Sequence, residues 1–441
     1  MEPNEKKLKQ IAKWVVKGML IGRKRNVSGI NSAKKVFPQV ESFLKENEGK
    51  VLSVSELEKK GLSKKQIDYL SNPDIGPILA LRKEKFVVRS TIGQCVRLRH
   101  HIDNWQLAKE IILECDRVGA HVFWTSADSK FYGQSIKESS MESLEDFPEM
   151  SKAILKSVDV TIYLEDEDEP DWKRGIFAEK LSAGQQNNQR AHEILDSRKV
   201  RWLVLGWPFE KTAKEFGISK DQFSNMLFDS LSESFSQRTK NTVMYYVKQF
   251  TNADKVHITH KDGTDFTLSV KGRPVLKDLG YLTEESIEKD GDVGLNLPSG
   301  EAFISPLETS ANGIIKFPHV NVYGHGFTSG LTLKFKNGRV DEFWADKGKK
   351  FLEDYLLENT PSTRIIGELG IGANQKAKWS GYLLTDEKIF GTIHIAIGNN
   401  TGSYHGKNKA SGHLDMVKPM KDGLMTVDGR KVMVNGLPHL K

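Results

Sequence analysis

The segment Gly367-Glu368-Leu369-Gly370-Ile371-Gly372 predicts an apolar strand, interrupted by glycine, that carries one carboxylate near its start. Downstream, residues 392–397 predict a strand with alternating faces that includes His394. The segment His413-Leu414-Asp415-Met416 then places an imidazole and a carboxylate two residues apart, which is one face if the segment is a strand. Carboxylates and imidazoles at such short intervals are typical of a site for one or two divalent metal ions. This chemistry favours hydrolysis by an activated water.

Six side chains make up the candidate site: Glu301, Glu368, Glu387, His394, His413 and Asp415. Taken alone, Glu301 is explained as a surface acid, Glu387 as part of a helix cap or turn, and His394 as an ordinary strand histidine. A charge at the start of an apolar strand, as at Glu368, is less ordinary because burying it alone is costly. The hypothesis therefore depends on the joint occurrence of the six residues.

The composition limits the kinds of protein and of site. The chain has 441 residues, of which 38% are hydrophobic and 28% charged, as expected for a soluble globular protein of two domains. Only Cys95 and Cys115 are present, so any metal must be held by oxygen and nitrogen, and a reducing compartment is expected. The apolar run Trp14–Ile21 is interrupted by Lys17 and Gly18 and predicts neither a signal peptide nor a membrane span. We therefore expect a cytoplasmic protein.

The chain divides into three parts by pattern. Residues 1–85 predict a basic helical extension, residues 86–250 an α/β domain, and residues 251–441 a β-rich catalytic domain that binds metal. The α/β domain is expected to have a parallel sheet with flanking helices, because buried strands alternate with helices. Its strands are predicted at residues 120–124, 158–164 and 200–206, and a helical stretch over 221–249 is expected to close it. The β-rich part is expected to begin with a hairpin over residues 255–270, turning at Asp262-Gly263.

The extension has two possible roles. The formal net charge of +7 is compatible with a nucleic-acid partner, but an acidic run at residues 165–169 and the acids spread along the chain favour a solvated surface. Ser55, Gly61 and Ser63 are predicted to bound short helices whose spacing resembles a helix-turn-helix only weakly. Packing on the body or at a subunit contact is the favoured role, because several apolar positions need burial. These positions are Ile11, Trp14, Val15, Val16, Leu20 and Ile21.

The C-terminal part resembles the aminopeptidase T family of metallopeptidases. The order and spacing of its motifs match over roughly residues 250–441, at 297–303, 367–372, 386–398, 406–409, 413–416 and 425–430. Members of that family have an α/β N-terminal domain, a β-rich catalytic domain and a dinuclear metal centre. They usually form homodimers and remove N-terminal amino acids from peptides. The resemblance implies the same fold, assembly and activity here, with peptide substrates that have a free N-terminus.

The resemblance also implies a role for each candidate residue. Glu301, Glu368, His394, His413 and Asp415 would be metal ligands, with Glu368 or Asp415 bridging two ions. Glu387 would be a ligand or the general base. Mixed Glu, Asp and His sites accept zinc, cobalt or manganese.

The sequence departs from the family's pattern at one place. The family often has a Tyr-Pro shortly after the strand that carries the histidine, whereas here Tyr404 is displaced and no proline follows. The role of a tyrosine in stabilising the tetrahedral intermediate is therefore open, and His405 or a metal ion would replace it.

Other kinds of chemistry lack their motifs. The chain contains no HExxH, no GxSxG and no GxGxxG after the first predicted strand, which excludes the helical zincin geometry and gives no support to a nucleophilic serine or a dinucleotide site.

Two non-enzymatic classes compete with the peptidase. One is a catalytically inactive peptidase fold that acts as a nucleic-acid-binding or interaction module through the basic extension. The other is a structural protein whose acids and histidines lie on solvated loops. The presence of all six candidate ligands favours the enzyme, so neither a nucleic acid nor a membrane is expected as a partner.

Overall fold

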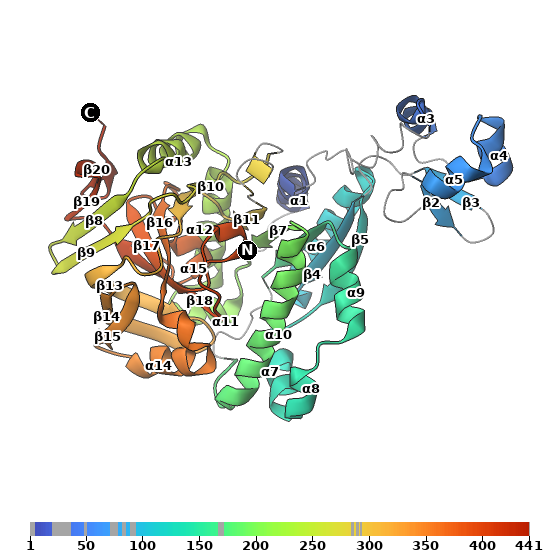
Figure 1. Ribbon diagram of the computed structural model, residues 1–441. Coiled ribbons are helices and arrows are strands. Elements are labelled where there is room, and N and C mark those ends of the chain that lie inside the picture. The colour runs from blue at the N-terminus through green and yellow to red at the C-terminus, as the bar shows by residue number, and fades with distance from the viewer. Residues whose placement is uncertain are drawn as a thin grey trace.

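The computed structural model describes most of the chain, namely residues 5–19, 37–47, 51–70, 78–81, 85–88, 94–165, 172–283, 286–287, 291 and 293–440. Leu20, Ile21 and residues 166–169 of the acidic run lie outside the described residues. Figure 1 shows two antiparallel sheets in yellow to red, an α/β region in cyan to green, and a small blue module at the far end. The mixed α/β and β-rich fold expected from the sequence is confirmed.

Five parallel strands form the sheet of the α/β region, in the order β11-β7-β6-β4-β5. They are β4 (Cys95–His100), β5 (His121–Ser126), β6 (Val160–Leu164), β7 (Arg201–Leu205) and β11 (Gly294–Leu297). Strands β5, β6 and β7 match the predicted positions, whereas β4 was not predicted, because only Val96 and Leu98 within it are aliphatic. Strand β11 follows residue 251 and so belongs to the predicted catalytic region, from which the chain returns to complete this sheet.

One detail of the predicted sheet was wrong. Strand β5 was expected to be buried, but it is an edge strand, with a neighbour on one side only. Phe123 and Trp124 of β5 are therefore 47% and 49% exposed.

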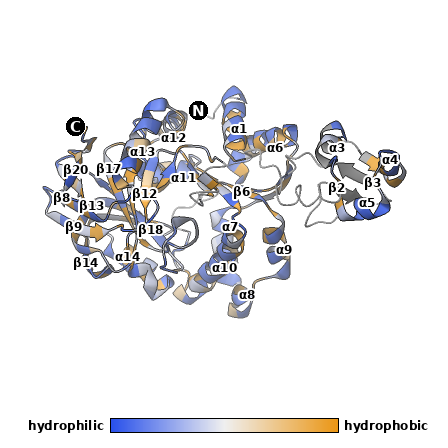
Figure 2. Cartoon of the chain, turned by 45° about the horizontal axis from the view of Figure 1, so that its top comes forward, coloured by the Kyte–Doolittle hydropathy of each residue, from blue (hydrophilic) through white to orange (hydrophobic). Residues whose placement is uncertain are grey.

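Helices cover both faces of the parallel sheet. Figure 2 shows α1 and α6 on one side of it and α7, α9 and α10 on the other. The helices of this region are η1 (Ile102–Asn104), α1 (Glu5–Met19), α6 (Trp105–Arg117), α7 (Ser129–Glu138), α8 (Met141–Glu145), α9 (Glu149–Ser157), α10 (Ala178–Ser197), α11 (Glu210–Glu215) and α12 (Lys220–Glu233). Ile11, Val15 and Val16 of α1 lie in the same apolar cluster as the sheet. Helix α1 is therefore part of the α/β region, in agreement with the expected packing role of these positions.

The catalytic region has two antiparallel sheets. The larger one is ordered β15 (Arg339–Trp344), β14 (Gly326–Lys336), β13 (Asn312–Val322), β9 (Thr264–Ser269), β8 (Lys255–His260), β19 (Gly423–Val427), β20 (Arg430–Val434), β21 (Leu437–Pro438). The smaller one is ordered β10 (Leu276–Asp278), β12 (Glu301–Ile304), β16 (Ile366–Gly372), β17 (Thr392–Gly398), β18 (His413–Pro419). The helices are α13 (Gln237–Phe250), α14 (Lys349–Glu358), η3 (Pro361–Arg364), α15 (Leu383–Asp386) and η4 (Gly402–Tyr404). The pairing of β8 with β9 confirms the predicted hairpin.

The helical stretch predicted over 221–249 is divided in the structure. Helix α12 ends at Glu233 and α13 begins at Gln237. The Ser236 side chain caps α13 by accepting a hydrogen bond from the backbone N–H of Thr239. A serine that satisfies an otherwise unpaired N–H starts a new helix instead of continuing the old one.

The N-terminal module comprises residues 37–88. It contains α3 (Val40–Asn47), β1 (Val51–Ser53), α4 (Val54–Lys59), α5 (Lys64–Leu70), β2 (Ile78–Leu81) and β3 (Lys85–Val88). The helices were expected, but the antiparallel sheet β1-β3-β2 was not, because strands of three or four residues are too short to show a period of two. The N-cap of α4 is Ser53, not Ser55, because the side chain of Ser53 forms a capping box with Glu56. The module has an apolar cluster of its own, which includes Phe43, Leu57 and Leu70.

None of the helices in the described ranges combines the length and the apolar character needed to cross a membrane.

Candidate metal centre

The pairing of β16, β17 and β18 brings the candidate residues into one row. Glu368 of β16 pairs with Ala396 of β17, and Ala396 pairs in turn with Asp415 of β18. His394 lies two residues before Ala396, and His413 two residues before Asp415. Because directly paired residues share a face and the side-chain period is two, all four side chains lie on the same side of the sheet.

Strand periodicity separates the site from the core. The intervening residues of the same strands, among them Leu369, Ile393, Ile395 and Met416, lie in the apolar cluster between the two antiparallel sheets. All residues of β16 and β17 are buried, so both faces of these strands are covered. One face is therefore apolar and packed, and the other is buried and polar.

Gly370 makes room for the His394 ring. It pairs directly with His394, and a Cβ on Gly370 would lie 1.9 Å from His394 Nε2. Only glycine therefore allows the imidazole to lie across β16, where its Nε2 atom is 3.3 Å from Glu368 Oε1 and 3.5 Å from Glu301 Oε2.

His413 is oriented by the chain around it. Its Nδ1 atom lies 2.7 Å from the Asn399 carbonyl oxygen, so Nδ1–H donates there. The Nε2 atom then faces Asp415 Oδ2 at 3.2 Å and Glu368 Oε2 at 3.5 Å. A backbone carbonyl that fixes the far nitrogen of a histidine is the usual support of a metal ligand.

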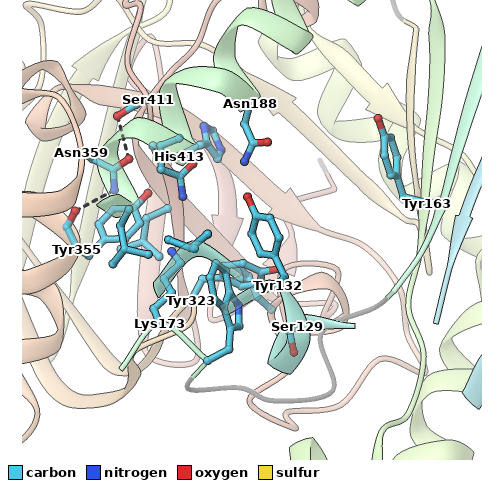
Figure 3. Close-up of a pocket in the computed structure, with 18 of the residues that line it drawn as sticks. Ser129, Tyr132, Tyr163, Lys173, Asn188, Tyr323, Tyr355, Asn359, Ser411 and His413 are labelled. Carbon is cyan, nitrogen blue, oxygen red and sulfur yellow. Dashed lines mark hydrogen bonds between the residues drawn. The ribbon is translucent and has the colours of Figure 1, made fainter. Parts of the chain in front are cut away.

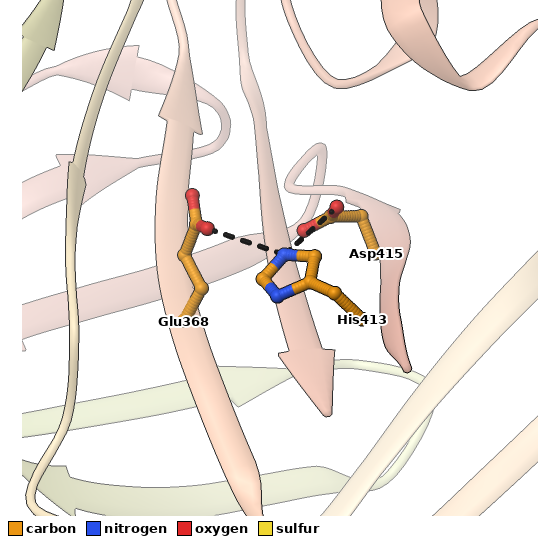
Figure 4. A group of neighbouring side chains, drawn as sticks. All are labelled: Glu368, His413 and Asp415. Carbon is orange, nitrogen blue, oxygen red and sulfur yellow. Dashed lines mark ion pairs between the residues drawn. The ribbon is translucent and has the colours of Figure 1, made fainter. Parts of the chain in front are cut away.

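The side chains form two groups with the spacing of metal ligands. In Glu368, His413 and Asp415, one potential ligand atom from each residue lies within 4.8 Å of the others, and the same holds for Glu387, His394 and Asp415. Figure 4 shows the first group, with the carboxylates of Glu368 and Asp415 on either side of the His413 ring. Asp415 belongs to both groups, which is the position expected of a bridging carboxylate. Glu301 belongs to neither group, although its Oε2 atom lies near His394.

Two observations show that the residues fit a cation. Among the described residues, Glu301 Oε2, His413 Nε2 and Asp415 Oδ1 are buried without a hydrogen-bond partner. Buried polar atoms are rarely left unpaired. In addition, the carboxylates of the site raise the pKa of its histidines. Burial alone would lower the pKa of His394, but Glu368 and the neighbouring carboxylates raise it to about 9. The carboxylates of the site therefore favour positive charge beside them, as a bound cation would supply.

The pKa values of Asp415 and Glu387 are shifted in opposite directions. Burial opposes ionisation of Asp415, but His413 outweighs it and lowers the pKa of Asp415 to about 2. Burial raises the pKa of Glu387 to about 8, against the effect of Lys388. The two carboxylates are therefore suited to different tasks, a permanent anion at Asp415 and a proton acceptor near neutral pH at Glu387.

Lys388 also belongs to this cluster of buried charges, although the sequence did not predict it. Its side chain is fully buried, and Nζ donates to Glu301 Oε1 at 2.5 Å and to Glu387 Oε1 at 2.6 Å. Burial would lower the pKa of Lys388, but Glu301 and Glu387 raise it, so the ammonium group stays charged. The sequence held one sign of this buried lysine: in Glu387-Lys388-Ile389 it stands between a candidate ligand and an apolar residue.

The neighbouring Asp386 has the capping role that was considered for this turn. Its carboxylate accepts hydrogen bonds from the backbone N–H groups of Ser380 and Gly381 at 2.9 and 2.8 Å. Asp386 thereby fixes the turn before α15, and Glu387, the next residue, faces the metal centre.

A small cavity adjoins the candidate ligands. It has a volume of about 50 Å³, and its lining includes Glu301, Glu368, Glu387, Asp415 and Tyr404. Since about 10–15 Å³ holds one water, the cavity has room for a few groups of that size. The Tyr404 ring stacks on His413, with ring centroids 5.0 Å apart. Tyr404 is therefore at the site despite its displacement in the sequence, whereas His405 is not among the lining residues.

A larger cavity lies between the α/β and catalytic regions and reaches His413. Its volume is about 490 Å³, within the range of small-molecule sites. Figure 3 shows side chains from both regions around it: Ser129, Tyr132, Tyr163, Lys173 and Asn188 from the first, and Tyr323, Tyr355, Asn359, Ser411 and His413 from the second. The Lys173 ammonium group joins the two regions through Glu358 Oε1 at 2.9 Å. The sequence did not predict this cavity, because its two walls are far apart along the chain.

Replacing Lys388 by methionine is expected to lower the free energy of unfolding by about 3–5 kcal/mol. The change leaves Glu301 and Glu387 buried without their common cation, and breaking a buried ion pair costs about that much. Denaturant unfolding of metal-free protein measures the loss. The double variant K388M/E301Q should recover part of it, since one unpaired charge is removed. The matched control is K334M, which removes a lysine that is 42% exposed. An equal, small effect of K388M and K334M would contradict the role given to Lys388.

The chain is similar to a family of metalloproteases and to several aminopeptidases. A family model described as thermophilic metalloprotease (M29) matches residues 84–436. The aminopeptidase AmpS of Bacillus subtilis (strain 168) is 24% identical over 294 residues, covering 59% of this chain and 70% of the relative. The aminopeptidase PepS of Streptococcus thermophilus is 23% identical over 303 residues, covering 63% of this chain and 72% of the relative. The solved structure of wild-type AmpT from Thermus thermophilus is similar in fold, with a TM-score of 0.62 at 19% identity, covering 79% of this chain and 94% of that one.

Proposed function

Since the chain belongs to the M29 family of thermophilic metalloproteases and is a metallo-aminopeptidase, we propose that it removes N-terminal amino acids from peptides with the help of two divalent metal ions. The observation that carries the two-ion proposal is the pair of ligand groups that share Asp415. In this assignment Glu368, His413 and Asp415 would hold one ion, and His394 and Asp415 would hold the other together with Glu301 or Glu387. Bound divalent ions lower the pKa of a water molecule and polarise the substrate carbonyl.

Glu387 would then carry the proton from the attacking water to the leaving amine. Glu387 Oε1 already accepts a hydrogen bond from Lys388, so its other oxygen, Oε2, is the atom proposed to take the proton from the attacking water. The water oxygen forms a bond to the carbonyl carbon, the peptide C–N bond breaks, and the proton passes from Glu387 to the leaving amine. The raised pKa of Glu387 supports this role, because a general base works best near the pH of the reaction.

The cavity between the two regions supports the choice of a peptide as substrate. It reaches His413, and its walls offer aromatic rings and amide groups to a chain of a few residues. The ring of Tyr404 stacks on that of His413, which supports a role for Tyr404 in contacting the reacting group. The identity of the ions as zinc, cobalt or manganese, the homodimer and the cytoplasmic location stay predictions from the sequence. The six candidate residues lie in or around one buried site, which gives no support to an inactive peptidase fold.

A peptide substrate whose N-terminus is acetylated should be cleaved at least about tenfold more slowly than the free peptide. The free amine is proposed to bind a metal ion or one of the carboxylates, and a hydrogen bond to a charged group is worth about 1.5–3 kcal/mol. The measurement is kcat/KM for a matched pair of peptides, followed by chromatography of the products. A peptide amidated at its C-terminus serves as the control and should be cleaved normally. Efficient cleavage of the acetylated peptide would indicate endopeptidase or amidase chemistry instead.

A further inference from the structure

The N-terminal module has the topology of a winged helix-turn-helix domain. Along the chain it runs α3, β1, α4, α5, β2, β3, and its sheet has the order β1-β3-β2. Strand β3 is central and antiparallel to both neighbours, with Phe86 paired to Leu52 on one side and to Ala80 on the other. The helix pair α4–α5 is thus inserted between the first strand and a β-hairpin. The family model matches the chain from residue 84 onward. All elements of the module except β3 therefore precede the part that the family model matches.

Helices α4 and α5 form the helix-turn-helix itself. Helix α4 ends at Lys59 and α5 begins at Lys64, so four residues connect them. Gly61 in this turn has a φ of +89°, a conformation that side chains with a Cβ rarely adopt. Short turns that contain glycine are typical of the motif. The buried side chains of Leu57 and Ile67 hold the two helices together.

The exposed surface of this motif is basic around the turn. Lys59, Lys60, Lys64 and Lys65 are all exposed and lie within seven consecutive positions. The nearest acids in sequence are Glu56, Glu58 and Asp68, and the first of these is bound to Ser53 at the start of α4. Lys64 and Lys65 open the second helix, the one that enters the major groove in helix-turn-helix proteins.

We infer that the N-terminal module binds duplex DNA, with α5 in the major groove and the four lysines on phosphates. B-form DNA is the favoured duplex because its major groove admits a helix, whereas the major groove of duplex RNA is too narrow. Figure 1 and Figure 2 both place α3, α4 and α5 at one end of the molecule, away from the catalytic sheets. The sequence alone favoured a packing role for the whole extension. The structure divides it, because α1 packs on the parallel sheet and the module keeps a core of its own. The inference is independent of the proposed peptidase mechanism.

Fluorescence anisotropy of a labelled duplex DNA of random sequence, titrated with the full-length protein, tests the inference. If four lysines contact phosphates, the logarithm of the binding constant should fall with the logarithm of the salt concentration with a slope of about −3.6. Affinity should then fall about a hundredfold between about 50 and 200 mM salt. The variant K64Q/K65Q should bind more weakly and reduce the slope by about two. The variant K59Q/K60Q should do the same, which guards against a local folding defect in α5.

The matched control is K255Q/K261Q, which removes two exposed lysines of the catalytic region at the other end of the molecule. It should leave both affinity and slope unchanged, and all three variants should keep peptidase activity. Three results would overturn the inference: no binding at the lowest salt, equal slopes for the wild type and the two module variants, or equally tight binding of duplex RNA of the same length.

Discussion

Replacing Glu368 by glutamine is expected to reduce kcat/KM by about a hundred- to several-thousandfold without unfolding the protein. Glu368 Oε1 faces His394 and Oε2 faces His413, so its negative charge acts on both histidines of the site. Glutamine keeps the volume of the side chain and removes that charge. Removing one partner from a buried charged cluster costs about 3–5 kcal/mol, and every 1.36 kcal/mol of transition-state stabilisation corresponds to about tenfold in rate.

Four further measurements separate this effect from a general one. Metal analysis of E368Q should find fewer than two ions per chain, and its circular dichroism spectrum should match that of the wild type. The variant E301Q should be milder, because Glu301 belongs to neither ligand group. The control variant E342Q, at a glutamate side chain that is 50% exposed, should behave as the wild type. Equal and negligible effects of E368Q and E301Q would show that the centre lies elsewhere.

Removal of the metal should reduce activity more than about a hundredfold. Even the outer residues that orient metal ligands are worth about 10–100-fold in activity, so loss of the ions themselves should cost more. The experiment treats purified protein with a strong chelator, verifies the metal content, and measures hydrolysis of an amino-acyl chromogenic substrate. Addition of zinc, cobalt or manganese should restore the activity.

The titration of metal back into the protein tests the number of ions. If Asp415 bridges two ions, activity should rise until two equivalents per chain are bound. Full recovery at one equivalent would exclude the two-ion proposal while leaving a metallo-aminopeptidase. Full activity in a sample verified to be free of metal would remove the metal from the mechanism altogether.

Much of the catalytic sheet could be predicted because its signal is local. In β17 the apolar Ile393, Ile395 and Ile397 alternate with His394 and Ala396, and this period of two is visible in the sequence itself. The same holds for His413 and Asp415, whose spacing already places them on one face. The family's motifs then linked Glu301 and Glu387 to these residues, although neither lies within β16, β17 or β18.

The sequence determined which residues are suited to metal chemistry and on which face of each strand they lie, since both properties depend on a few consecutive residues. The tertiary structure decided how these faces meet. It placed Asp415 in both ligand groups, inserted the Lys388 ammonium between two carboxylates, and returned β11 to the first sheet. It also formed the cavity between two regions and the β1-β3-β2 sheet of the module. All of these depend on contacts between segments separated by tens to hundreds of residues. The local alternation of apolar and polar side chains does not indicate which distant segments will be in contact.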